Sequence, residues 1–141
     1  MVVAPCVAAG DGRAVIVGLG TDLISLRRIA DVHGRQGQRF LDRVYTADEQ
    51  RYALELRDPS ERLASRWAAK EACMKALGTG WAKGVTFTQI ALLPGDDRGA
   101  PRLALTGVAL AVATRLGAAR WHCSVSHSDG LAIATVILES I

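Results

Sequence analysis

Residues 67–80 read WAAKEACMKALGTG, and they carry the strongest structural signal in this chain. Their apolar spacing and closing glycines predict a helix that ends at Gly78. Glu71 and Lys75 lie four residues apart, so the helix would place both side chains on one face. A carboxylate and an ammonium group in one place suit a metal-bridged phosphate. The pair alone fits an ordinary surface salt bridge better, so the metal hypothesis depends on other residues.

The remaining pattern predicts an α+β fold. Asp58 and Pro59 favour the start of the long helix, as N-cap and first helical residue, and we expect it to continue to Leu77. Short apolar runs predict strands at residues 14–20, 87–93, 102–105, 121–126 and 131–138. Further helices are expected at about residues 25–33, 46–56 and 106–117. Neighbouring hairpins, one of them at Asp129-Gly130, favour an antiparallel-rich sheet wrapped around the long helix.

Composition limits the class of protein. The chain has 141 residues, half of them hydrophobic and 22% charged, as expected for one globular domain. A net charge of +3 fits an acidic partner or a phosphorylated substrate, but it is too weak to indicate nucleic acid. The three cysteines form no close pair, which favours reduced thiols in a cytoplasmic protein.

The start of the chain has no function that we can assign. Residues 1–13 are apolar at first, lack a basic region, and are too short to cross a membrane. We expect a flexible N-terminal extension without secretion or membrane insertion, followed by one domain over residues 14–141.

Asp22 is the second candidate metal ligand. It closely follows the apolar run of residues 14–20, so we expect it at the end of a strand, where the chain turns. Such a carboxylate is more often a turn residue. Together with Glu71, however, it would supply the carboxylates of a Mg²⁺ site that water and a substrate phosphate complete. Mn²⁺ accepts the same oxygen ligands.

Two other groups of residues have both a functional and a plain interpretation. His127 ends an alternating strand, where it would contact phosphate, move a proton, or serve only as a hydrogen-bonded structural histidine. Arg28, Arg35 and Arg39 would form one basic face if their helix continued through two glycines. That face is either solvated charge or a docking site for an acidic protein. Cys73 is expected to be buried and unreactive.

Three segments, in this order, resemble the holo-acyl-carrier-protein synthase family, the small bacterial class of 4′-phosphopantetheinyl transferases. They are GLGTDL at residues 18–23, RWAAKEA and KALGTG between residues 66 and 80, and HCSVSHS at residues 122–128. The resemblance covers roughly residues 14–139 and implies the family's fold. It also implies Mg²⁺-dependent transfer of 4′-phosphopantetheine from coenzyme A to a serine of apo acyl carrier protein, with release of 3′,5′-ADP, in fatty acid or polyketide biosynthesis.

The resemblance assigns roles to particular residues. Asp22 and Glu71 would bind Mg²⁺, and Lys75 would stabilise the diphosphate oxygens. The resemblance leaves open which group deprotonates the carrier serine, and our hypothesis is Glu71 acting through a water. Contacts to coenzyme A would come from Arg66, Lys75, Gly78, Thr79, Gly80, Pro101, His127 and Ser128. Arg28, Arg35 and Arg39 would bind the acidic carrier protein. Family members of this length are typically homotrimers with active sites between subunits.

Two alternatives use the same residues differently. A Mg²⁺-dependent hydrolase of nucleotide diphosphates would need more clustered carboxylates than Asp22 and Glu71. A basic module that binds nucleic acid would need aromatic residues among its basic ones, and only 5% of this chain is aromatic.

Overall fold

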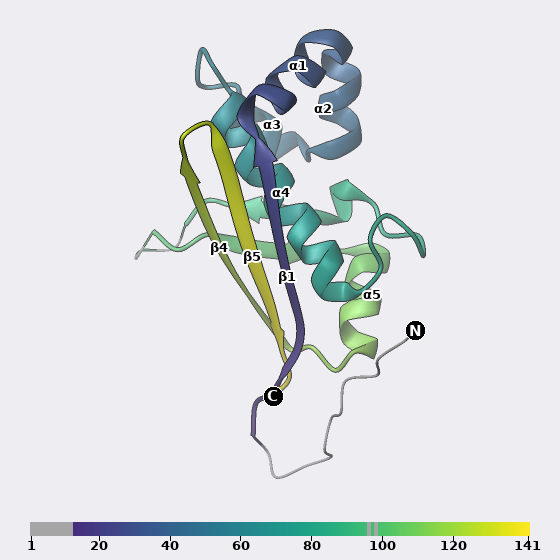
Figure 1. The fold of residues 1–141 in the computed structure, drawn as a ribbon. Helices are drawn as coiled ribbons and strands as arrows, with labels where there is room; N and C mark the ends of the chain where they lie inside the picture. Colours follow the sequence, from purple (N-terminus) through teal and green to yellow (C-terminus); the bar gives the residue numbers. More distant parts are fainter. Residues whose placement is uncertain (1–12, 96, 98) are drawn as a thin grey trace.

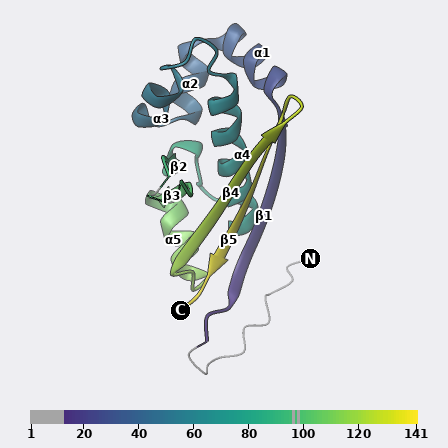
Figure 2. The same cartoon turned by 90° about the vertical axis from the view of Figure 1, so that its left-hand side faces the viewer.

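The computed structural model describes residues 13–95, 97 and 99–141, and it has the expected α+β architecture (Figure 1). The elements are β1 (Ile16–Ser25), α1 (Leu26–Gln36), α2 (Gln38–Val44), α3 (Ala47–Ala53), α4 (Ser60–Leu77), the 3₁₀ turn η1 (Phe87–Gln89), β2 (Ile90–Leu93), β3 (Arg102–Leu105), α5 (Gly107–Arg115), β4 (Arg120–Ser128) and β5 (Leu131–Glu139). Helices α1 to α3 lie at one end of the long helix α4, and α5 lies toward the other end (Figure 2).

The main sheet has the strand order β1-β5-β4, and both pairings are antiparallel. Strands β1 and β4 are therefore its two edges. Asp129 and Gly130 both have positive φ angles, 53° and 75°, as a type I′ hairpin turn requires. The predicted hairpin is confirmed. A second, two-stranded sheet pairs β2 with β3, also antiparallel.

Helix α4 packs directly on the inner face of the main sheet. A Cβ atom at Gly20 would overlap the carbonyl oxygen of Ala72, and one at Gly18 would overlap that of Ala76. Glycine at both positions therefore lets the backbones of β1 and α4 touch. Along α4, Leu63 and Met74 are fully buried. The core thus lies between one long helix and one sheet face, as the fold class predicts.

Local capping signals set the helix starts. The Ser25 side chain accepts a hydrogen bond from the Arg28 backbone N–H at 3.3 Å. Thr46 and Glu49 form a capping box at the start of α3, with distances of 3.3 Å and 3.0 Å. Asp58 accepts from the N–H of Ser60 at 3.1 Å, so α4 begins one residue later than predicted.

Three local predictions were wrong. Strand β1 starts at Ile16 and continues to Ser25 rather than ending at residue 20, because β5 pairs with it along this whole length. Residues 87–89 form the 3₁₀ turn η1 rather than the start of a strand. Helix α3 ends at Ala53 instead of near residue 56.

The basic helix is also interrupted. Helix α1 continues through Gly34 but ends before Gly37, which has a φ angle of 56°. Arg28 and Arg35 therefore lie in α1 and Arg39 in α2, so the predicted single helical face does not exist. None of the described helices is long and apolar enough to cross a membrane. Residues 1–12, most of the predicted extension, lie outside the described residues.

Candidate active site

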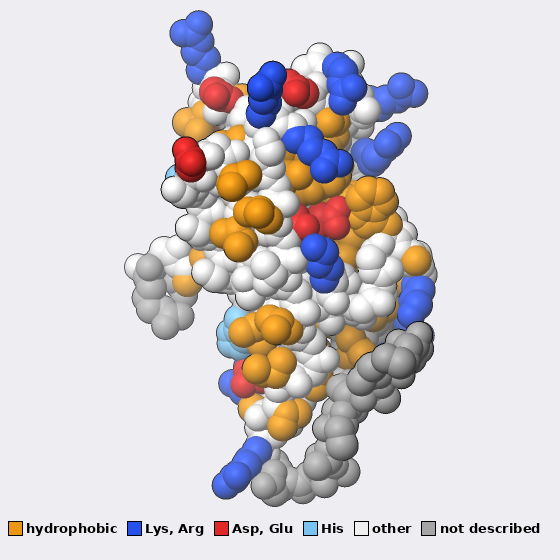
Figure 3. Space-filling model, in the orientation of Figure 1, with side chains coloured by type: hydrophobic (Ala, Val, Ile, Leu, Met, Phe, Trp, Pro, Cys, Tyr) orange, Lys and Arg blue, Asp and Glu red, His pale blue; other side chains and the backbone are white. Residues whose placement is uncertain are grey.

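Strand β1 and helix α4 bring Asp22, Glu71 and Lys75 into one cleft of about 330 Å³. Lys75 Nζ lies 3.0 Å from Asp22 Oδ1 and donates to the carbonyl oxygen of Thr21 at 2.9 Å. In Figure 3, acidic side chains lie among basic and hydrophobic side chains near the middle of the face that is shown. The three side chains predicted to act together are thus neighbours, although Asp22 is 49 positions or more from the other two.

The position of Asp22 follows from strand alternation. Asp22, like Gly18 and Gly20, has its side-chain position on the face of β1 that meets α4. Asp22 lies within the strand, paired with Ala134, so the prediction that it follows the strand end was wrong. Because the two glycines let α4 come close, a short aspartate reaches the helix face that bears Lys75.

Glu71 is half-buried, and its carboxylate has a specific partner. Trp81 Nε1 donates a hydrogen bond to Glu71 Oε1 at 2.7 Å. Burial raises the pKa of Glu71 above its usual value, and nearby Asp22 adds to this, whereas the Trp81 hydrogen bond and Lys75 act in the opposite direction. Sequence reasoning did not include Trp81. Its place directly after the glycines that end α4 was the available signal.

The two carboxylates fit a hard cation. Among the described residues, no group of three or more histidine, cysteine or acidic side chains is arranged to bind a metal without other ligands. Asp22 and Glu71 in one cleft would supply two oxygen ligands, and Mg²⁺ commonly takes the rest from water and substrate phosphate. The donor set therefore suits Mg²⁺ or Mn²⁺, and the metal role of both residues stays a prediction.

The segment from Gly78 to Gly80 closes α4. Gly78 and Gly80 have φ angles of 73° and 52°, and the N–H groups of Thr79 and Gly80 donate to the Met74 carbonyl at 3.2 Å and 3.4 Å. No atom lies within 4 Å of where a Cβ would stand on either glycine. A ligand would find open space beside this backbone, and the predicted contact with the pantetheine arm stays a prediction.

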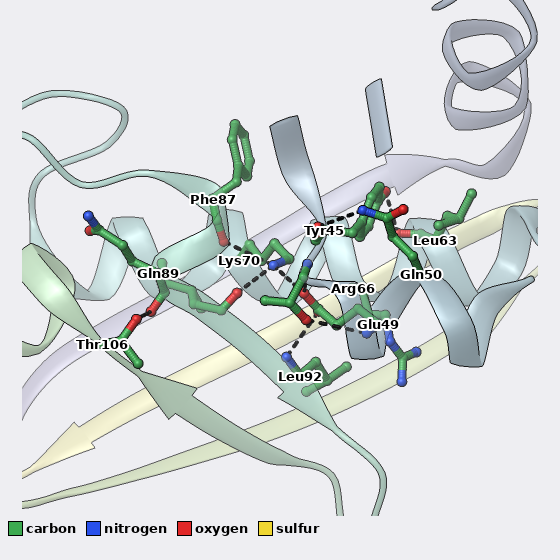
Figure 4. A network of polar contacts seen from close by, with 12 residues as sticks. Tyr45, Glu49, Gln50, Leu63, Arg66, Lys70, Phe87, Gln89, Leu92 and Thr106 are labelled. Carbon is green, nitrogen blue, oxygen red and sulfur yellow. Dashed lines mark hydrogen bonds and ion pairs between the residues drawn. The ribbon is translucent and has the colours of Figure 1, made fainter. Parts of the chain in front are cut away.

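Arg66 lies away from the cleft in this chain. Its guanidinium is buried, contacts the Tyr52 ring at 4.3 Å, and donates to the Arg62 carbonyl at 3.3 Å. Burial lowers its pKa. Nε has no hydrogen-bond partner among the described residues. Figure 4 shows Arg66 beside the buried network of Glu49 and Lys70, so its predicted phosphate contact stays a prediction.

The other predicted ligand contacts lie in two further places. His127 Nε2 is 3.0 Å from Glu61 Oε1, and with Ser128 it lines a small pocket at the hairpin end of the sheet. Pro101 lines a separate pocket near Trp121. Asp22 and His127 are on the two edge strands, β1 and β4, and they line two different pockets.

The matched family model decides what this arrangement belongs to. It describes the 4′-phosphopantetheinyl transferase superfamily and covers residues 18–136, which include α4 and most of β1 and of the β4–β5 hairpin. The chain belongs to the 4′-phosphopantetheinyl transferase superfamily.

Relatives within this superfamily are similar along nearly their whole length. The chain is 45% identical over 125 residues to the holo-[acyl-carrier-protein] synthase of Vibrio parahaemolyticus, covering 89% of this chain and 98% of the relative. Among solved structures, it is similar to the synthase of Neisseria meningitidis, with a TM-score of 0.78, 35% identity, and coverage of 88% and 98%. It is also similar to the Bacillus anthracis synthase, which was solved in complex with CoA (3′,5′-ADP). That comparison has a TM-score of 0.73 and 38% identity, and it covers 89% of this chain and 98% of the synthase chain. The chain is accordingly a transferase of the holo-[acyl-carrier-protein] synthase class.

Proposed function

We propose that this protein transfers 4′-phosphopantetheine from coenzyme A to a serine of apo acyl carrier protein in fatty acid or polyketide biosynthesis, with release of 3′,5′-ADP. The observation that supports this best is the convergence of Asp22, Glu71 and Lys75 on one cleft. The coenzyme A bound to the similar Bacillus anthracis enzyme supports the choice of donor.

The reaction forms a bond from the serine oxygen to the phosphorus that bears pantetheine and breaks the bond from that phosphorus to the bridging oxygen. A Mg²⁺ ion held by Asp22 and Glu71 would supply charge neutralisation on the diphosphate. Lys75 Nζ, which lies 3.0 Å from Asp22 Oδ1, would contact phosphate oxygens bound in the same cleft. It would stabilise the charge that develops on the leaving group.

The serine must lose its proton during the attack. Glu71 is our choice for the acceptor, through a water, because its burial raises the pKa of the carboxyl and makes it a better base. Arg28, which lines the cleft, and Arg35 and Arg39 on α1 and α2 would bind the acidic carrier beside it. The free thiols Cys73 and Cys123 fit a reducing cytoplasm.

We further infer a homotrimer with its active sites between subunits. The outer face of the main sheet carries exposed apolar side chains: Leu19, Leu23, Leu131 and Ile133. Figure 3 shows hydrophobic side chains over the sheet on this side of the molecule. Such a face is favourable to bury against another copy. Because Asp22 and His127 line separate pockets, we infer that a neighbouring chain supplies the second half of a combined site.

Intact-protein mass spectrometry tests the reaction directly. Apo acyl carrier protein, coenzyme A and Mg²⁺ are incubated with the wild type, Asp22→Ala or Glu71→Ala. We expect a gain of one phosphopantetheine with the wild type and none with either variant. If several apo carriers gain no mass while coenzyme A is cleaved, the hydrolase alternative replaces this proposal.

Mixing two inactive variants tests the shared site. An Asp22→Ala chain keeps His127, and a His127→Ala chain keeps Asp22, so mixed trimers would contain intact interfaces. With random assembly of equal amounts, about a quarter of the interfaces would have both residues. Recovery of activity near that fraction supports sites between subunits, whereas no recovery after co-refolding contradicts them.

A further inference from the structure

Trp81 lies at the cleft in an unusual state, with its side chain exposed and yet ordered by specific contacts. The residue is 68% exposed. Its indole nitrogen donates to Glu71 Oε1 at 2.7 Å, and its ring packs on Phe87 with 5.8 Å between the ring centroids. Phe87 in turn stacks on Trp67, which also lines the cleft, at 4.8 Å. The aromatic packing thus sets where the indole N–H points.

The hydrogen bond fixes the Glu71 carboxylate. An indole has one donor and no acceptor, so it can contact only an oxygen with a free lone pair. Because Glu71 Oε1 accepts the hydrogen bond from Trp81 Nε1, rotation of the carboxylate is restricted. Carboxylates that bind metals are commonly oriented by such a second hydrogen bond, whose loss weakens metal binding.

We propose that Trp81 is a positioning residue for Glu71, holding Oε1 through the indole N–H so that the carboxylate presents Oε2 to a divalent cation shared with Asp22. This inference rests on the proposed function, because it assumes the metal site formed by Asp22 and Glu71. It goes further in assigning a role to a side chain outside the motifs that imply the activity.

The test is Mn²⁺ binding without substrate, measured from the electron paramagnetic resonance signal of free Mn²⁺. Trp81→Phe keeps a ring to pack on Phe87 but removes the N–H. We expect its Mn²⁺ dissociation constant to rise about 10-fold, at the low end of the range for such supporting contacts. The matched control is Trp121→Phe, which removes the indole that donates to the Leu103 carbonyl at 2.9 Å. That variant should bind Mn²⁺ like the wild type.

A second measurement follows the indole N–H of Trp81 in the wild type, so it does not depend on metal binding by a mutant. Each of the three tryptophans gives one indole N–H resonance in a nitrogen-15 correlation spectrum. The Trp81 resonance is the one absent from Trp81→Phe. It should shift on addition of Mg²⁺ and in Glu71→Gln, while the Trp121 resonance stays in place.

The outcomes separate the two proposals. If wild type and Glu71→Gln bind Mn²⁺ equally, the metal site itself is wrong. If only Glu71→Gln loses binding, and Trp81→Phe binds as well as or more tightly than the wild type, Trp81 merely packs on Phe87 and the positioning role is rejected. A Trp81 resonance unaffected by both Mg²⁺ and Glu71→Gln rejects that role as well.

Discussion

Lys70 and Glu49 form a buried ion pair with 2.6 Å between Nζ and Oε1, and neither side chain is more than 1% exposed. Lys70 Nζ also donates to the carbonyls of Phe87 and Ile90, while Glu49 accepts from the backbone N–H of Leu92 at 3.1 Å (Figure 4). Burial lowers the pKa of Lys70, and the nearby Glu49 carboxylate opposes that effect. The pair connects α4 to α3, and its hydrogen bonds to backbone connect both helices to η1 and β2.

Replacing Lys70 with Met should destabilise the fold strongly. The change leaves the Glu49 charge buried without its partner, for which a cost of about 3–5 kcal/mol in unfolding free energy is expected. Urea denaturation measures it. The control is Arg51→Ala, which removes the exposed pair Arg51–Asp48 of 3.0 Å and should cost less than about 1 kcal/mol. Equal costs for the two variants would mean that the buried pair contributes no more than a surface contact.

Two glycine-to-alanine substitutions should have opposite signs. At Gly20 the new Cβ meets the backbone of Ala72 and Ala76, which cannot move aside, so Gly20→Ala should lower the unfolding free energy by about 3 kcal/mol. Gly34 lies within α1 with no atom near its Cβ position, so Gly34→Ala should raise it by about 0.5–1 kcal/mol. Thermal unfolding compares them. If Gly20→Ala had the same unfolding free energy as the wild type, the direct contact between β1 and α4 would be contradicted.

The Cys73 thiol should make stability depend on alkaline pH. Burial raises its pKa from 9.0 to about 12. An unfolded chain therefore releases this proton near pH 9 while the folded chain keeps it, so stability is lost as the pH rises above 9. Between pH 8 and pH 10 the wild type should lose about 1.4 kcal/mol more unfolding free energy than Cys73→Ala. Denaturant titrations at both pH values check this. Identical pH dependence in the two proteins would place Cys73 in contact with water.

The exposed face of the main sheet should control assembly. Leu23 and Ile133 are paired across β1 and β5, and they are 57% and 39% exposed. Ile133→Asp would place a charge in the interface that we infer, so we expect monomers by light scattering and loss of transferase activity together. Leu56→Asp changes an exposed leucine away from the sheet and should leave the assembly intact. A wild-type monomer with full activity would remove the basis for shared sites.

Much of the fold was predictable because its signals are local. The Ser25 cap, the capping box of Thr46 and Glu49, and the end of α4 at Gly78 each depend on residues within one helical turn. The Asp129-Gly130 turn specifies its hairpin in the same way. The pairing of Glu71 with Lys75 on one face follows from helix geometry alone.

Other features required partners distant in sequence. The sequence itself determined which residues form α4, where the last hairpin turns, and that Glu71 and Lys75 face the same way. Only the tertiary structure decided that β1 extends through Asp22, because β5, more than 100 positions later, supplies its hydrogen bonds. Tertiary contacts likewise brought Trp81 to Glu71 and separated Asp22 from His127 on opposite edges of one sheet. Helices and turns are specified by near neighbours, whereas strand limits and site geometry depend on which distant segments pack together.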